Sequence, residues 1–140
     1  MNDDLEARIR ASFARQTIME TFGGELLEVG RGSVVIAAPI APHLLQQAGS
    51  AHAAVAFGLG DSAAGYSALT TMPEGSDVVT VEMKINLLAP AVGSRLIATG
   101  RVLRAGRRIV TVQSEVEAEA ADGSRKPVAV MLGTMVPVTA

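Results

Sequence analysis

The chain has 140 residues, which is enough for one compact domain and too short for two ordinary ones. Hydrophobic residues make up 49% and charged residues 19%, an apolar balance that predicts burial of part of the surface against another subunit. The formal net charge is −2, and the chain offers no basic stripe that could replace phosphate counterions, which argues against a nucleic-acid partner.

The absence of cysteine excludes disulfides, thiolate zinc sites and a cysteine nucleophile. The two histidines, His43 and His52, have no recognised metal-ligand spacing, so we expect neither a metal nor another cofactor. The N-terminal residues are charged and lack the apolar region of a signal peptide. No charge-free apolar run approaches the length of a membrane span. We therefore expect a cytoplasmic protein without membrane contact.

The first predicted element is an amphipathic helix with an acidic start, in which apolar residues recur every four positions: Leu5, Ile9 and Phe13. Gly23-Gly24 breaks the chain after it. Residues 25–29 and 33–38 then predict a short β-hairpin, and prolines end its second strand. His43 begins a loop and has no predicted partner.

Residues 51–69 predict one long helix, because this apolar run of mostly Ala and Gly is too long for a strand. Ser50 is its expected N-cap. Three glycines inside it each cost ~1 kcal/mol of helix propensity relative to Ala, which makes sense if backbone or ligand approaches closely there. Asp61 is the one carboxylate in this run, and such a group is costly unless it is paired, solvated or used.

The second half of the chain predicts four strands, at residues 78–89, 95–103, 108–120 and 127–138. In the first of them, Thr80 is expected on the polar face. The apolar side chains are expected on the opposite face: Val79, Val81, Met83, Ile85 and Leu87. Asp122-Gly123 is a strong hairpin signal. Residues 1–140 are therefore expected to form a single α+β domain, with an antiparallel sheet wrapped around one helix.

This order, with one buried helix before a four-strand meander, resembles the hotdog fold. The residues resemble those of the phenylacetic-acid-degradation (PaaI-like) acyl-CoA thioesterases. That family carries an Asn or Gln, a His six residues later and a catalytic Asp or Glu nine residues after the His, the spacing of Gln46, His52 and Asp61. Thr80 and Leu88-Ala89-Pro90-Ala91 match a later strand of the family, so the resemblance covers nearly the whole chain.

The resemblance implies hydrolysis of a CoA thioester, with Asp61, Gln46 and Thr80 in catalysis. Asp61 would activate a water or attack directly, and Gln46 would hold the thioester oxygen or the water. Thr80 would orient the water or the carboxylate. The N–H of Ala53, next to His52, would hold the oxyanion. The family's His-Gly-Gly is His52-Ala53-Ala54 here, and the added methyls narrow the approach of a carbonyl.

Ala53 and Asp61 are eight residues apart on one helix, which separates them by ~12 Å along its axis. They cannot both touch one small thioester. We therefore expect each site to combine Ala53 and Gln46 of one subunit with Asp61 and Thr80 of another, across a two-fold axis. The expected assembly is an obligate homodimer, alone or as a dimer of dimers.

Each of these residues also has a structural interpretation. Asp61 could be a buried structural carboxylate, Gln46 an ordinary loop amide with Gln47 as a competitor for its role, and Thr80 a packing residue. His52 is expected to fix the loop before the helix rather than to transfer protons. Arg107 and Arg108 belong to an arginine cluster near a turn, which would bind CoA phosphates or simply be solvated.

Two other function classes remain open at this point. A hotdog hydratase or dehydratase would use a catalytic His together with the acidic residue, and the placement of His52 at the helix start disfavours this. A non-catalytic acyl-CoA-binding protein of the same fold is the third class. As a sensor it would normally need an attached DNA-binding segment, and the N-terminal helix is too short and too acidic to supply one.

Overall fold

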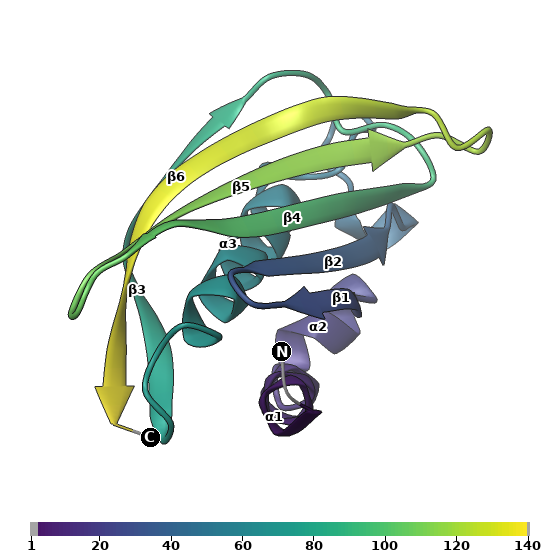
Figure 1. Ribbon diagram of the computed structural model, residues 1–140. Helices are drawn as coiled ribbons and strands as arrows, with labels where there is room; N and C mark the ends of the chain where they lie inside the picture. The colour runs from purple at the N-terminus through teal and green to yellow at the C-terminus, as the bar shows by residue number, and fades with distance from the viewer. Residues whose placement is uncertain (1–2, 140) are drawn as a thin grey trace.

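The computed structural model describes residues 3–139, in which six antiparallel strands form one sheet that curves around a central helix (Figure 1). This confirms the predicted α+β class. The elements in chain order are α1 (Asp3–Ala14), α2 (Thr17–Phe22), β1 (Glu25–Gly30), β2 (Ser33–Pro39), the 3-10 helix η1 (Pro42–Leu44), α3 (Ala53–Leu69), β3 (Ser76–Leu87), β4 (Arg95–Ala105), β5 (Val110–Glu119) and β6 (Arg125–Thr139).

The strand order in the sheet is β1-β2-β4-β5-β6-β3. The predicted antiparallel meander is confirmed for β4, β5 and β6, but a four-strand meander is wrong. Strand β3 pairs with β6 and not with β4, because the connection at residues 88–94 carries the chain past the ends of β5 and β6 (Figure 1). Strand β3 is therefore an edge strand, and one side of its backbone has no partner among residues 3–139.

The core lies between α3 and the concave face of the sheet. Inward and outward residues alternate along β5, and its five inward residues are all buried: Val110, Val112, Ser114, Val116 and Ala118. The helix comes so close to the sheet that a Cβ on Gly100 of β4 would collide with the backbone of Ala63. Ser114 donates a 2.7 Å hydrogen bond to the Gly60 carbonyl, so the polar group buried in this interface is paired.

The N-terminal segment packs on the other side of α3. Helix α1 is confirmed, and its Ile9 is fully buried. Helix α2 was not predicted, because residues 17–22 form too short a segment for a helical period to emerge. Phe22 of α2 packs against Gly58 of α3, where an added Cβ would lie 2.7 Å from the ring.

The predicted apolar face of β3 is wrong in its first half. A β-bulge lies between Thr80 and Glu82, so Val81 is an extra residue in the pairing with β6. Val79 and Val81 are 44% and 60% exposed, while Val78 and Met83 pack against the core. The bulge therefore turns Thr80 toward α3, where a regular alternation would have pointed it away.

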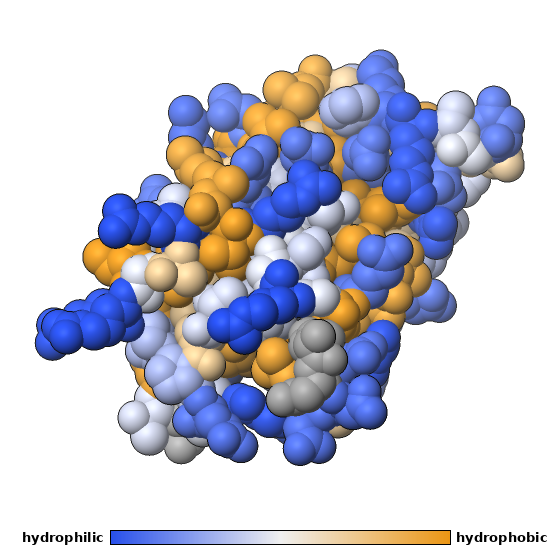
Figure 2. Space-filling view, viewed as in Figure 1, coloured by the Kyte–Doolittle hydropathy of each residue, from blue (hydrophilic) through white to orange (hydrophobic). Residues whose placement is uncertain are grey.

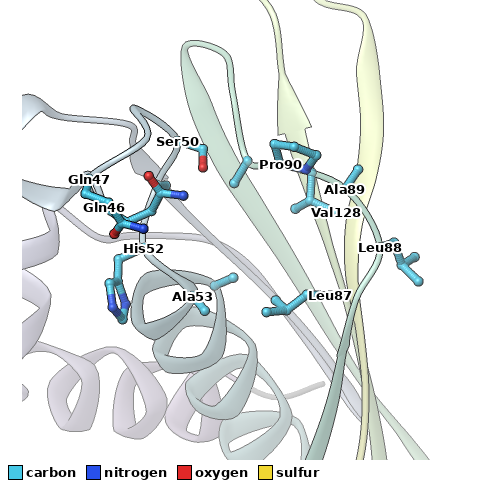
Figure 3. A pocket seen from close by; sticks show the side chains of 13 residues that line it. Gln46, Gln47, Ser50, His52, Ala53, Leu87, Leu88, Ala89, Pro90 and Val128 are labelled. Atoms are coloured by element: carbon cyan, nitrogen blue, oxygen red, sulfur yellow. The ribbon is translucent and has the colours of Figure 1, made fainter.

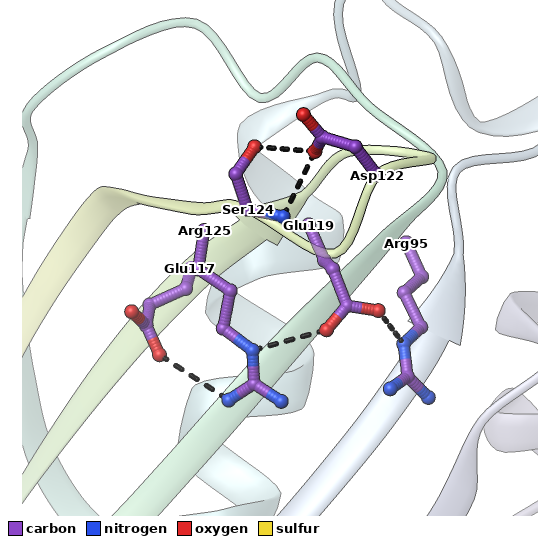
Figure 4. Close-up of polar contacts among 6 residues, drawn as sticks. All are labelled: Arg95, Glu117, Glu119, Asp122, Ser124 and Arg125. Carbon is purple, nitrogen blue, oxygen red and sulfur yellow. Dashed lines mark hydrogen bonds and ion pairs between the residues drawn. The ribbon is translucent and has the colours of Figure 1, made fainter.

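The turn between β5 and β6 is exposed, and polar contacts surround it (Figure 4). Asp122 accepts hydrogen bonds from Ser124, and Gly123 has the positive φ of 86° that the predicted hairpin turn requires. Hydrogen bonds from Arg95 and Arg125, at 2.8 and 3.0 Å, lower the pKa of Glu119. Exposed ion pairs of this kind contribute little to stability, and this end of the sheet carries no candidate chemistry.

Candidate active site

The first cavity lies at the N-terminal end of α3 and has a volume of about 490 Å³. The loop residues Gln46, Gln47 and Ser50 lie on one side of it, and the segment from Leu87, the last residue of β3, to Pro90 lies on the other (Figure 3). His52 and Ala53, at the start of the helix, also line it. The structure therefore brings Gln46, His52 and Ala53 into one site.

His52 is the N-cap of α3, and the expected cap at Ser50 is wrong. The helix begins at Ala53, and Nδ1 of His52 accepts a 2.9 Å hydrogen bond from the Ala54 N–H. A ring nitrogen that accepts this bond carries no proton, so any ring proton of neutral His52 is on Nε2. The His52 ring thus takes one of the amides that a helix N-terminus leaves without a backbone partner.

This cap distinguishes the two alanines that follow it. The Ala54 N–H is occupied by His52, and Ala54 does not line the cavity. Ala53 lines the cavity, and its N–H makes no hydrogen bond to any residue between 3 and 139. Ala53 is therefore the residue whose free amide, with the positive end of the helix dipole, can stabilise a negative oxygen.

Gln46 is held by the loop in which it lies. Its backbone N–H donates to the Ser50 carbonyl at 2.8 Å, and its side-chain oxygen accepts from the Ala48 N–H. The Nε2 group makes no hydrogen bond within the described part of the chain, so its N–H groups are free to donate. Gln47 also lines the cavity but is exposed, whereas Gln46 is partly buried.

Asp61 lies in a second cavity, of about 310 Å³, on the same helix. The Thr80 hydroxyl donates a 2.7 Å hydrogen bond to Oδ1 of Asp61 and also lies 3.2 Å from the sulfur of Met135. Oδ2 has no partner among residues 3–139. Burial raises the pKa of Asp61 above its ordinary value of 3.8, and the bond from Thr80 opposes this. A carboxylate with a raised pKa is a stronger base.

Four residues near Asp61 form a series of hydrogen bonds that the sequence did not reveal. Ser62 Oγ donates to Gln16 Oε1 at 3.1 Å, Gln16 Nε2 donates to the Tyr66 hydroxyl at 3.1 Å, and Tyr66 lies 3.0 Å from Ser12 Oγ. All four line the Asp61 cavity. Pairs that are 46 to 54 residues apart leave no periodic signal, so pattern reasoning could not have found them.

No residue lines both cavities. The geometry expected from eight residues of helix is therefore present: the free amide of Ala53 and the carboxylate of Asp61 open into different spaces on one chain. The first cavity has the groups that bind a carbonyl oxygen but lacks a base. The second has the base but lacks the free amide at the helix start.

Arg107 and Arg108 lie in the turn between β4 and β5, which ends in a hydrophilic projection at the left of Figure 2. Neither lines the cavity of Ala53 or that of Asp61. Arg107 borders a separate hollow of about 320 Å³, with residues 71–73 that follow α3 and with Pro137 of β6. Within residues 3–139 neither arginine forms an ion pair.

The described residues contain no group of three His, Cys, Asp or Glu side chains that could hold a metal ion. Their helices include none that is both long and apolar enough to cross a bilayer.

Comparison with known proteins places this geometry in context. Residues 48–122, which include Asp61, Thr80 and the start of α3, match the model of the thioesterase superfamily. A crystal structure of a thioesterase family protein from Silicibacter pomeroyi is 34% identical, with a TM-score of 0.93, over 97% of this chain and 99% of that one.

Two more distant structures share the fold. The E. coli PaaI protein from the phenylacetic acid degradation operon is 20% identical, with a TM-score of 0.83, over 96% of this chain and 93% of that one. A thioesterase from Haemophilus influenzae is 19% identical, with a TM-score of 0.79, over 91% of this chain and 87% of that one. The expected hotdog thioesterase fold is confirmed.

Proposed function

Because the chain belongs to the thioesterase superfamily and is a thioester hydrolase, we propose that it is an acyl-CoA thioesterase whose active site is shared between two subunits. The observation that carries this proposal is the separation of Ala53 and Asp61 into cavities with no common residue. Neither cavity alone has both the Asp61 carboxylate and the free Ala53 amide at the start of the helix. Two copies in antiparallel contact along α3 would complete two equal sites.

Asp61 is the general base in the proposed reaction. It removes a proton from a water whose oxygen attacks the thioester carbonyl carbon. Thr80 holds Oδ1, so Oδ2 is free to accept this proton. The oxyanion that develops takes a hydrogen bond from the Ala53 N–H of the other subunit, and the amide of Gln46 assists it. Collapse of this intermediate breaks the carbon–sulfur bond, and the CoA sulfur takes the proton from Asp61.

Direct attack by Asp61 is the other use of the same carboxylate. It would join an Asp61 oxygen to the carbonyl carbon, release CoA and leave an anhydride for water to hydrolyse. Turnover in the presence of hydroxylamine tests for this anhydride. An Asp61 hydroxamate detected by mass spectrometry would assign direct attack.

The edge of the sheet supports the proposed dimer. Strand β3 has an unpaired backbone edge, and it and the residues after it present apolar side chains to solvent: Val79, Val81, Leu87 and Leu88. An exposed apolar edge strand is a surface that proteins cover by pairing with another chain. Leu87 and Leu88 also line the Ala53 cavity, so the same edge adjoins the site. Whether two such dimers associate further is decided by the mass of the assembly in solution.

Arg107 and Arg108 are the proposed contacts for the phosphates of CoA. Their support is that both guanidinium groups are exposed and without an ion pair in the described chain. The test compares acyl-CoA with the matching acyl-pantetheine, which lacks the nucleotide. Replacing both arginines with alanine should raise KM for acyl-CoA and leave KM for acyl-pantetheine unchanged. An unchanged KM for acyl-CoA would remove this part of the proposal.

The proposed function is tested with a panel of aryl-, short-chain and medium-chain acyl-CoA substrates and a measurement of released CoA. Wild type should hydrolyse at least one of them, and Asp61→Asn should be slower by about 10²–10⁴-fold, the usual contribution of a general base. Release of no CoA by wild type would contradict the activity. Equal rates for both proteins would contradict the role of Asp61.

A further inference from the structure

Gln16 occupies an unusual position at the junction of α1 and α2. It is the N-cap residue of α2, yet its side chain makes no capping bond to that helix. Glutamine is not a favoured N-cap residue, so this position does not explain the residue chosen. The side chain instead crosses to α3, where Oε1 accepts from Ser62 and Nε2 donates to Tyr66.

The carboxamide has one further donor. Its Nε2 carries two hydrogens, and only one of them is used, in the bond to Tyr66. No other residue between 3 and 139 accepts a hydrogen bond from the Gln16 side chain. The side chain is partly buried and lines the same 310 Å³ cavity as Asp61 and Thr80. Besides the carboxylate, the cavity therefore holds a fixed amide with an unused N–H.

Two hydrogen bonds fix this amide in place. The Tyr66 hydroxyl accepts from Gln16, so its own proton is available to Ser12 Oγ at 3.0 Å. Ser62, which donates to Oε1, is the residue next to Asp61 on α3. The amide is thus held on the helix that carries the base, and it loses little freedom when it binds a ligand.

We infer that Gln16 is a further residue of the active site, whose free Nε2–H donates to an oxygen of the reacting species in the Asp61 cavity. This inference rests on the proposed function. The oxygen belongs either to the acyl thioester or to the attacking water, and both offer the lone pair that the amide needs. It follows that the N-terminal segment, which packs beside α3, builds part of the site.

The test uses Gln16→Met and Gln16→Glu, with Gln113→Met and Gln113→Glu as controls. Gln113 of β5 lines neither cavity. Gln16→Met should lower kcat/KM by about tenfold, the value of one hydrogen bond, and the Gln113 variants should match wild type. A loss confined to KM assigns the oxygen to the substrate, and a loss confined to kcat assigns it to the water.

Gln16→Glu keeps the acceptor for Ser62 and adds a second carboxylate to the cavity. The other titratable groups that line the cavity are Arg15, Tyr66 and Asp77. Repulsion between like charges should raise the pKa of Asp61, so the acid limb of the kcat/KM profile should move to higher pH. An unmoved limb would show that residue 16 does not face Asp61.

Two results would overturn the inference. The first is a folded Gln16→Met variant with wild-type kcat and KM. The second is a Gln16→Glu variant with an unmoved acid limb. If wild type proves inactive on every thioester, the proposed function fails separately. NMR titration of the Asp61 carboxyl carbon in wild type and Gln16→Glu then decides whether residue 16 faces Asp61, since equal pKa values would refute that placement.

Discussion

The Thr80 hydroxyl donates a 2.7 Å hydrogen bond to Oδ1 of Asp61, which joins the edge strand β3 to the central helix α3. The β-bulge after Thr80 makes this contact available. The bond occupies Oδ1 of the carboxylate, so Oδ2 remains available in the cavity that Asp61 lines. It also acts against burial, which raises the pKa of the same group.

Replacing Thr80 with valine keeps the shape of the side chain and removes this bond. The pKa of Asp61 should then rise further, because a hydrogen bond to the charged form lowers it. The acid limb of kcat/KM should move to higher pH, and kcat at pH 7 should fall by about tenfold as the carboxylate loses its fixed orientation. Thr80→Ser should restore both values. A Thr80→Val variant with a wild-type pH profile would contradict the role given to this bond.

Removing the charge of Asp61 should stabilise the fold. Because burial raises the pKa in the folded state above the ordinary value of 3.8, the folded protein binds more protons than the unfolded chain between the two pKa values. The free energy of unfolding therefore falls as pH rises through this window and stays lower above it. Asp61→Asn should have a higher Tm than wild type at pH 8. This difference should shrink as the pH falls toward 3.8, and a lower Tm at pH 8 would refute the cost assigned to the buried charge.

Two glycines of α3 should respond differently to the same change. A Cβ on Gly65 would lie 3.8 Å from Met135, without a clash, but Gly65 lines the Asp61 cavity. Gly65→Ala should keep or raise the Tm, since alanine favours the helix by ~1 kcal/mol, and should lower kcat/KM. A Cβ on Gly58 would lie 2.7 Å from the Phe22 ring, so Gly58→Ala should destabilise the fold by about 1–3 kcal/mol. Thermal melts and rates measured together check both outcomes. A Gly65→Ala variant with the wild-type kcat/KM would count against the second cavity as part of the site.

The exposed edge strand offers a test of the assembly. Val81 is 60% exposed on β3, at the bulge. Val81→Asp should disfavour burial of this edge against a second copy, because a charge would have to be desolvated there. Light scattering should detect monomers, circular dichroism should stay like that of wild type, and activity should be lost with the dimer. A folded monomer with full activity would contradict the shared site.

Much of the fold could be predicted because it depends on local periodicity. The alternation in β5 and the Asp122-Gly123 turn led to the meander of β4, β5 and β6. The Ala- and Gly-rich run led to α3. The position of β3 at the edge could not be predicted in the same way, because strand order is set by long-range pairing. The bulge carries no glycine or other signal, so the exposure of Val81 was also beyond the pattern.

The candidate site also contains residues that the sequence identifies and contacts that it does not. The spacing of Gln46, His52 and Asp61 can be read in the sequence through resemblance, and the helix rise separates the two ends of α3. The capping bond of His52 could not be predicted, because it depends on the residue at which the helix begins. The expected cap at Ser50 put that residue too early in the chain. Gln16 is brought to Asp61 only by the packing of α1 and α2, which no spacing within the sequence reports.

The shared active site is tested most directly by combining two inactive subunits. Asp61→Asn removes the base. Ala53→Pro removes the free amide at the first position of α3, where proline is well tolerated, and the extended His52 before it, with φ −62° and ψ 143°, suits a following proline. With a different affinity tag on each subunit, co-expression and tandem purification yield the heterodimer alone.

In that heterodimer the intact Ala53 of one subunit would meet the intact Asp61 of the other at one of the two sites. We expect each parent homodimer to be nearly inactive and the heterodimer to recover about half of the wild-type rate. A heterodimer as inactive as its parents would contradict the shared site, as would an Ala53→Pro homodimer with the wild-type rate.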